Sequence, residues 1–161
     1  MTMAVQDAVD TVSVAFESWS TLWPECEPLM FEHWKEVREN RAGLPFAINC
    51  EIAQRLDEAG AGICLGARHK GSLVGYLIWF VTPNMESVGA LQATLGPFFV
   101  LPEYEGIGYK MWTLGIERLR QIGVKTAHTH CSVVGPRQEK VKKFWQLVGA
   151  KPYEMKYELV L

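Results

Sequence analysis

Hydrophobic residues recur with two different periods along the N-terminal third of the chain. Residues 11–16 alternate apolar and polar side chains, which predicts a first strand. Residues 25–38 repeat apolar side chains every three or four positions, so we expect a helix that begins after Pro24 and buries one face. Residues 46–59 show the same period and predict a second helix. The side chains expected to face inward from this second helix are Ile48, Ile52 and Leu56.

The middle of the chain has the composition of β-strands. Residues 63–68 and 73–82 are rich in strand-forming side chains and are joined by turn residues at 69–72, so they predict a hairpin. Residues 90–101 predict a further strand. Because proline cannot donate to a β-ladder, we expect this strand to bend at Gly96-Pro97.

The C-terminal third alternates between helix and strand. A helix with one apolar face follows a glycine-containing loop and ends at Gly123. Residues 124–132 predict a strand that runs parallel to the previous one, because a right-handed helical crossover joins them. Residues 138–148 predict a last helix, and residues 153–161 a last strand.

These segments follow the order β-α-α-β-β-β-α-β-α-β, which predicts a mixed sheet flanked by about four helices. The chain has 161 residues, 48% of them hydrophobic and 21% charged, as in an ordinary globular domain. We therefore expect residues 1–161 to form a single α/β domain, with residues 1–10 as a flexible lead-in. Disordered, collagen-like and coiled-coil classes are excluded by this composition.

The charge and the cysteine content indicate which partners and which cellular location to expect. A net charge of −2 gives no sign of a basic nucleic-acid surface. The first basic residue is Lys35, so no basic leader precedes an apolar segment, and no apolar run reaches the ~18 residues that span a bilayer. The four cysteines lack metal-site spacing. We expect free thiols, no metal, no membrane contact and a cytoplasmic location.

The most informative segment is FFVLPEYEGIGYKMWTLGIERLRQIG, in which an apolar strand enters a short loop that opens a helix. The loop carries Gly106-Ile107-Gly108, followed by Tyr109 and Lys110. A helix N-terminus presents unpaired N–H groups and favours an anion, so this loop suits a phosphate or pyrophosphate. A tight packing turn is the alternative. The spacing fits neither a Walker motif nor a dinucleotide fingerprint.

The element order and this segment resemble the GNAT acyltransferase superfamily, in which a strand ending in Val-x-Pro precedes a glycine loop that binds the coenzyme A pyrophosphate. The segments HWKEV, KGSLVGYLIWFV and LVGAKPYEMKYELVL resemble a phage and proteobacterial subgroup of it. The resemblance covers nearly the whole chain. It implies a splayed mixed sheet, acetyl-CoA as cofactor, and acyl transfer to an amine by direct attack in a ternary complex.

The resemblance assigns the coenzyme to the end of strand 90–101 and to the loop after it. A backbone N–H on this strand stabilises the developing oxyanion in the superfamily, and Phe99 or Val100 is the matching position here. Glu103 stands where the superfamily usually carries Arg or Gln, and Phe144-Trp145 stands where many relatives carry a tyrosine as general acid. The residues expected to contact acetyl-CoA are Phe99, Val100, Leu101, Glu105, Gly106, Ile107, Gly108, Tyr109 and Lys110.

The expected reaction needs a base, because an ammonium group has no lone pair with which to attack a thioester. His128 and His130 lie two residues apart, so both are expected to point to one face of strand 124–132. His130 lies nearer the C-terminal end of that strand, and its unperturbed pKa suits neutral pH, so it is the first candidate base. Glu86 is the second. A structural histidine and a solvated carboxylate are the alternatives.

Three residues are candidates for the acceptor site. His33 and Trp34 lie on the first helix, a region that borders the acceptor in the superfamily, and Trp79 could line a pocket for a flat group. Core packing is the alternative for all three. The acceptor expected is a small-molecule amine or the amine of a modified nucleobase. A non-catalytic coenzyme-binding module and a homodimer also remain open. A basic cluster that either meets the coenzyme 3′-phosphate or faces solvent is formed by Arg137, Lys140, Lys142 and Lys143.

Overall fold

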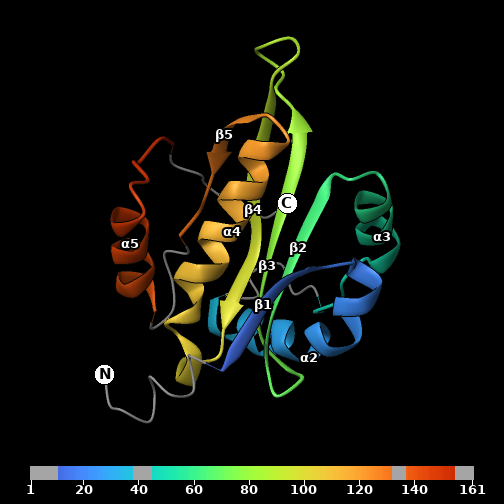
Figure 1. The fold of residues 1–161 in the computed structure, drawn as a ribbon, viewed down its shortest axis with the longest axis vertical. Helices are drawn as coiled ribbons and strands as arrows, with labels where there is room; N and C mark the ends of the chain where they lie inside the picture. Colours follow the sequence, from blue (N-terminus) through green and yellow to red (C-terminus); the bar gives the residue numbers. More distant parts are fainter. Residues whose placement is uncertain (1–10, 38–44, 132–136, 155–161) are drawn as a thin grey trace.

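The computed structural model describes residues 11–37, 45–131 and 137–154. At its centre is a five-stranded sheet in the order β1-β2-β3-β4-β5 (Figure 1). Neighbouring strands are antiparallel except β4 and β5, which are parallel. This mixed sheet, flanked by helices, confirms the predicted α/β fold class. The strands are β1 (Val12–Glu17), β2 (Gly62–His69), β3 (Ser72–Pro83), β4 (Leu91–Val100) and β5 (Val124–His128). The helices are α2 (Trp19–Val37), α3 (Cys50–Glu58), the 3₁₀ turn η1 (Pro102–Tyr104), α4 (Ile107–Gln121) and α5 (Gln138–Leu147).

The central strand β3 is buried on both faces of the sheet. Figure 1 shows α4 lying across the strands with α5 beside it, while α2 and α3 lie next to each other. Met111 and Leu119 of α4 share one buried cluster with Leu77 of β3. Leu22 of α2 shares a second cluster with Tyr76, also of β3. Two consecutive residues of β3 belong to different clusters because side chains alternate along a strand.

Helix α2 begins earlier than its sequence predicts, at Trp19 instead of residue 25. The carbonyl of Ser18 accepts a hydrogen bond from the Leu22 N–H at 3.0 Å, which starts the helical ladder there. Pro24 therefore lies inside the helix together with Pro28, and the prediction that Pro24 begins it is wrong. Both prolines are exposed and lie four residues apart, so the carbonyls that lose their helical donors face water.

Helix α3 begins at Cys50, later than the predicted residue 46. The reason is a cap: the side-chain oxygen of Asn49 accepts a hydrogen bond from the Ile52 N–H at 3.1 Å. None of the residues of α3 is fully buried. Ile52 faces the sheet, as the periodicity predicts, but its side chain is 55% exposed. Periodicity identifies an apolar face but not whether another element covers it.

The hairpin between β2 and β3 confirms the predicted turn. Lys70 and Gly71 are its two central residues, with φ angles of 50° and 87°. Positive φ at both positions is typical of the tight turns whose twist matches that of the flanking strands. The turn fixes the register in which β3 pairs with β2.

Strand β4 is irregular where the sequence predicts a bend. Leu77 pairs with Phe98 and Trp79 pairs with Leu95, so the single residue Ile78 lies opposite Gly96-Pro97. This two-against-one count is a β-bulge, in which proline is tolerated because the ladder is already interrupted. The bulge sharpens the twist of β4 in the middle of the sheet.

Strand β5 is shorter than predicted. It ends at His128 and pairs with β4 from Leu91 to Thr94, beyond which the two strands separate. His130 therefore lies after the strand in irregular backbone, and the expectation that it shares a strand face with His128 is wrong. The predicted last strand, 153–161, lies mostly outside the described residues.

Trp79 is a core residue and does not line a surface pocket. It is 0% exposed, and its ring centroid lies 5.3 Å from that of Trp112. Its Nε1 atom has no hydrogen-bond partner among the described residues. A Cβ atom on Gly115 of α4 would come within 2.8 Å of this Nε1. The glycine thus lets α4 approach the sheet closely, and Trp79 is inaccessible to an acceptor.

Replacing Gly115→Val is expected to lower the free energy of unfolding by about 2–3 kcal/mol, because a rigid buried indole cannot yield to the added carbons. Urea denaturation measures the change. Glu117→Val, at an exposed position of the same helix, is the matched control and should cost less than about 1 kcal/mol. Equal losses in the two variants would contradict the close packing of α4 on Trp79.

Candidate functional site

The last residues of β4 have an edge that β5 does not cover. The Leu101 N–H donates to the Val74 carbonyl at 2.9 Å, so residue 101 presents its hydrogen-bonding groups to β3. These groups alternate sides along an antiparallel strand. The N–H of Phe99 therefore also faces β3, whereas those of Phe98 and Val100 face the open side. Of the two sequence-derived candidates for the oxyanion donor, the register favours Val100.

Arg137 lies at this open edge. Its Nη1 donates to the Val100 carbonyl at 3.2 Å, which confirms that the polar groups of Val100 face away from β3. Its guanidinium carbon lies 5.1 Å from the centre of the Phe99 ring. Arg137 precedes α5, so these contacts tie the beginning of α5 to the end of β4.

The glycine loop joins β4 to α4. Gly106 precedes the helix, and Ile107 and Gly108 form its buried beginning. The Gly108 N–H donates to the Glu105 carbonyl at 3.1 Å. Helix geometry leaves the first N–H groups without helical acceptors, which here applies to those of Gly106, Ile107 and Tyr109. The positive end of the helix dipole lies at the same point, so the loop has the donors and the potential that suit an anion.

Glu105 is paired with a cation instead of pointing at this helix end. Lys140 Nζ lies 2.9 Å from Glu105 Oε1 and 3.1 Å from Oε2, which links the loop to α5. Both side chains are largely exposed, so the pair adds at most about 1 kcal/mol of stability. Its local effect is electrostatic, because Lys140 offsets the negative charge nearest the loop.

His33, an expected acceptor-site residue, contacts the end of β4 from the α2 side. Its Nδ1 lies 2.9 Å from the hydroxyl oxygen of the fully buried Tyr76. Its ring stacks on that of Phe99, with the centroids 5.0 Å apart and the planes at 24°. Residues from α2, β3 and β4 therefore meet beside the open edge of β4.

Burial, and to a smaller extent the nearby charges of Arg137 and His130, together lower the pKa of His33 to about 4. The imidazole is neutral at pH 7 as a result. Through the ring of Phe99, His33 also neighbours Arg137, the residue that donates to the Val100 carbonyl.

His130 is exposed, and its backbone is held by the last helix. The carbonyl of His130 accepts a hydrogen bond from Trp145 Nε1 at 3.1 Å. Trp145 thus holds the backbone of the candidate base His130. In the sequence comparison with the superfamily, it is Trp145 and its neighbour Phe144 that stand where a tyrosine general acid is expected. The neighbouring Cys131 places its Sγ 3.7 Å from the Gln138 carbonyl, and burial raises the pKa of this thiol. A thiolate at that point is disfavoured.

Two other expected site residues lie elsewhere. Glu86 is in the exposed turn between β3 and β4, at the top of Figure 1. The ten residues of β4, roughly 33 Å of strand, separate this turn from the glycine loop, so Glu86 lies far from the expected coenzyme site. Trp34 is half-buried, with its ring 6.3 Å from Phe31 and 5.8 Å from Phe46.

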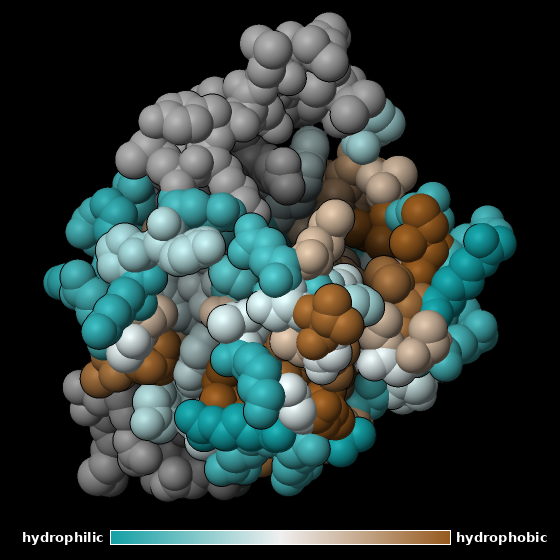
Figure 2. Space-filling model, turned by 90° about the horizontal axis from the view of Figure 1, so that it is seen from above, coloured by the Kyte–Doolittle hydropathy of each residue, from teal (hydrophilic) through white to brown (hydrophobic). Residues whose placement is uncertain are grey.

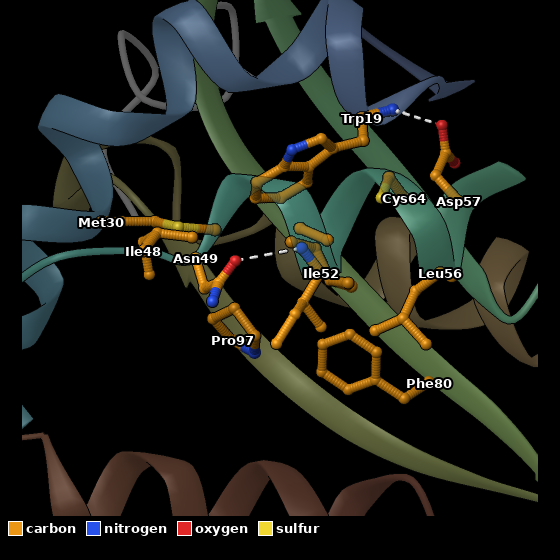
Figure 3. Close-up of a pocket in the computed structure, with 13 residues that line it drawn as sticks. Trp19, Met30, Ile48, Asn49, Ile52, Leu56, Asp57, Cys64, Phe80 and Pro97 are labelled. Atoms are coloured by element: carbon orange, nitrogen blue, oxygen red, sulfur yellow. Dashed lines mark hydrogen bonds between the residues drawn. The ribbon is translucent and has the colours of Figure 1, made fainter.

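A cavity of about 220 Å³ lies between α3 and the sheet (Figure 3). Ile48, Ile52 and Leu56 line it from the α3 side, and Phe80 and Pro97 line it from the sheet. Pro97 belongs to the bulge of β4, two residues before Phe99. The cavity is therefore adjacent, along β4, to the His33 contact.

Residues 11–149 match the Acetyltransferase (GNAT) family, and the chain belongs to that family. The match spans β1 to α5 and so includes the open edge of β4 and the glycine loop. The superfamily predicted from the Val-x-Pro strand and the glycine loop is confirmed. The narrower phage and proteobacterial subgroup has no support from these matches. No protein among those with curated descriptions matches the sequence.

Solved structures share the fold at low sequence identity. A ribosomal-protein-alanine N-acetyltransferase from Brucella melitensis biovar Abortus 2308 is 18% identical with a TM-score of 0.72, covering 94% of this chain and 99% of its own. An aminoglycoside acetyltransferase, meta-AAC0020, from an uncultured soil metagenomic sample in complex with sisomicin is 16% identical with a TM-score of 0.73, covering 94% and 97%. AAC(6')-Iy in complex with the bisubstrate analog CoA-S-monomethyl-acetylneamine is 14% identical with a TM-score of 0.69, covering 92% and 96%.

In the part of the chain that the structure describes, no helix is long and apolar enough to cross a membrane. Among the same residues, no group of three or more His, Cys, Asp or Glu side chains is arranged to hold a metal ion.

Two contributors to the site were missed from the sequence. Tyr76 lies in the middle of an apolar strand, where a tyrosine gives no sign that its hydroxyl meets a histidine on a distant helix. Phe98 has the same backbone orientation as Val100, and only the register of β3 and β4 shows this. The sequence does carry one signal for Tyr76: it lies within an apolar, strand-forming segment that is expected to be buried, and a buried tyrosine hydroxyl needs a hydrogen-bond partner.

The free energy of unfolding is expected to fall as the pH drops from 7 to about 4.5. The pKa of His33 is lower in the folded chain than in the unfolded chain. As the pH falls below the unfolded-state pKa of this histidine, the unfolded chain binds a proton that the folded chain does not, and the unfolded state is stabilised relative to the folded state. The loss due to His33 is up to about 3 kcal/mol.

The control for this prediction is His33→Gln, which keeps a hydrogen-bonding group near the Tyr76 hydroxyl but does not titrate. Urea denaturation of both proteins at pH 7 and 4.5 gives the change in the free energy of unfolding with pH for each. Parallel pH profiles would contradict a buried neutral imidazole at residue 33.

Proposed function

We propose that the protein transfers an acetyl group from acetyl-CoA to a primary amine. The observation that carries this proposal is the open edge of β4, which leads directly into a helix N-terminus at Gly106. Backbone groups of Phe98 and the N–H of Val100 on that edge suit an extended amide-containing chain, which can add to it like a further strand. The N–H groups of Gly106, Ile107 and Tyr109 suit the coenzyme pyrophosphate.

The acetyl donor supplies an activated thioester carbonyl, and the protein residues assist its transfer. The outward N–H of Val100 or Phe98 donates to the carbonyl oxygen, which becomes negative as the amine attacks. His130 removes a proton from the amine, directly or through a water. Phe144-Trp145 offers no acidic hydroxyl, so the departing thiolate is protonated by solvent or by the imidazolium formed at His130.

Direct attack of the amine, without an acetylated protein intermediate, is favoured by the state of three of the four cysteines, Cys26, Cys64 and Cys131. Burial raises the pKa of Cys64 to about 12 and also raises the pKa of Cys26 and Cys131. Thiols held in the protonated form are poor nucleophiles. A ternary complex of donor, acceptor and protein therefore fits this chain better than a covalent relay.

Acetyl-CoA is expected to raise the melting temperature, because a ligand that binds the folded state stabilises it. Gly108→Val should abolish this shift, since its side chain would occupy the space beside the loop N–H groups. The fold should persist, because a Cβ at residue 108 meets only the Phe98 Cζ atom at 3.4 Å. Thr113→Val, on the same helix, is the control and should keep the shift. No shift with the parent protein at millimolar acetyl-CoA would overturn the proposed coenzyme site.

His130→Ala is expected to lower kcat by ~10²-fold or more at neutral pH and to remove the rise of the rate with pH that reports a titrating base. Thiol release from acetyl-CoA, followed across a panel of amines, measures both. His128→Ala is the matched control, because residue 128 lies at the end of β5 and its ring packs at a tilt against that of Tyr153. An unchanged rate and pH profile in His130→Ala would exclude His130 as the base.

A coenzyme-binding module without catalysis is the second candidate, favoured by Phe144-Trp145 in place of a general acid. It predicts the melting shift with acetyl-CoA but no thiol release with any amine. The two functions are thus separated by one pair of measurements on the same protein.

A further inference from the structure

The cavity beside α3 is apolar and bounded by rigid groups. Ile52 and Leu56 of α3 face Phe80 of β3 and Pro97 of β4 across it, with the indole of Trp19 on one side (Figure 3). Seen from above, hydrophobic side chains gather on the side of the molecule where α3 lies, and hydrophilic ones border them (Figure 2). Ile52 is 55% exposed although its helix directs it toward the sheet.

We propose that the acceptor amine carries one aromatic or branched apolar group, which binds in this cavity while the amine points toward the end of β4. The inference rests on the proposed acetyl transfer and names the class of its second substrate. Such a group would also cover the exposed side chain of Ile52, so the apolar surface of the acceptor and that of Ile52 would be removed from water together.

The size of the cavity sets the size of the group. Its volume is about 220 Å³. A dry protein cavity of about 150 Å³ lined by Leu, Ile and Phe binds benzene. The cavity therefore accommodates a phenyl to indole ring or a branched chain of similar size.

The residues that line the cavity carry little negative charge, which favours an acceptor with a single amine over one with several ammonium groups. Asp57 carries the one charged side chain among the described residues that line the cavity, and its Oδ2 accepts a hydrogen bond from the Trp19 N–H at 2.9 Å. Cys64 is also in the wall, and burial raises its pKa to about 12, so it adds no charge at pH 7. An acceptor with several ammonium groups would find too few carboxylates here, whereas an apolar group attached to a single amine fits.

The cavity lies within reach of the open edge of β4. Pro97 lines it, and the next residue, Phe98, has its N–H on the open edge. Val100 is three residues from Pro97, roughly 10 Å along the strand. A ring and a two- or three-carbon linker together extend from the cavity toward that edge and cover part of the distance, so 2-phenylethylamine is a suitable first probe.

The test compares thiol release from acetyl-CoA with 2-phenylethylamine, ethanolamine and a series from ethylamine to hexylamine. We expect kcat/KM to rise about fourfold for each added methylene until the cavity is filled, and 2-phenylethylamine to exceed ethanolamine by about 10²-fold. Ile52→Gln should lower kcat/KM for 2-phenylethylamine about tenfold and leave ethanolamine nearly unchanged.

Leu147→Gln is the matched control, because Leu147 is 73% exposed on α5 and does not line the cavity. It should leave both amines unchanged, and melting curves check that both variants fold. Equal kcat/KM for ethanolamine and 2-phenylethylamine would overturn the apolar acceptor while acetyl transfer stands. Absence of any acetyl-CoA melting shift would instead overturn the proposed function, and the acceptor inference with it.

Discussion

The separation of β4 from β5 after Thr94 and His128 is the constraint on which the rest of the site depends. Inside a sheet each strand pairs its polar backbone groups with both neighbours, but beyond this point β4 has a partner on one side only among the described residues. The bulge at Gly96-Pro97 twists β4 just before its edge opens. Arg137, which bonds the Val100 carbonyl, shows that a charged group can occupy that edge.

Much of the fold follows from local sequence chemistry, and the exceptions have physical reasons. The Lys70-Gly71 turn and the bend at Gly96-Pro97 depend on neighbouring residues alone, so the sequence predicts them correctly. The sequence places the beginning of α2 too late because a proline suits a first turn, whereas in the structure Pro24 is tolerated on the solvent-facing side of the helix. Ile52 has the period of a buried residue, but whether a helix face is covered depends on the tertiary packing.

The candidate site could be predicted from the sequence only in part. The glycine loop is local, and it lies at the beginning of α4 as expected. His33 and Arg137 lie far apart in the sequence, and the structure places both against the ring of Phe99, which no spacing in the sequence could show. The direction of the Val100 N–H depends on the register of β3 with β4, and the exclusion of Glu86 from the site depends on the length of β4.

A line of aromatic rings connects the centre of the sheet to the candidate base. Trp79 and Trp112 have centroids 5.3 Å apart, Trp112 and Trp145 have centroids 5.1 Å apart, and Trp145 donates to the carbonyl of His130. Rigid rings transmit displacement because close-packed interiors compress little. The backbone position of His130, an exposed residue, therefore depends on packing in the middle of the protein. A substitution at either buried ring, Trp79 or Trp112, displaces a residue on the surface.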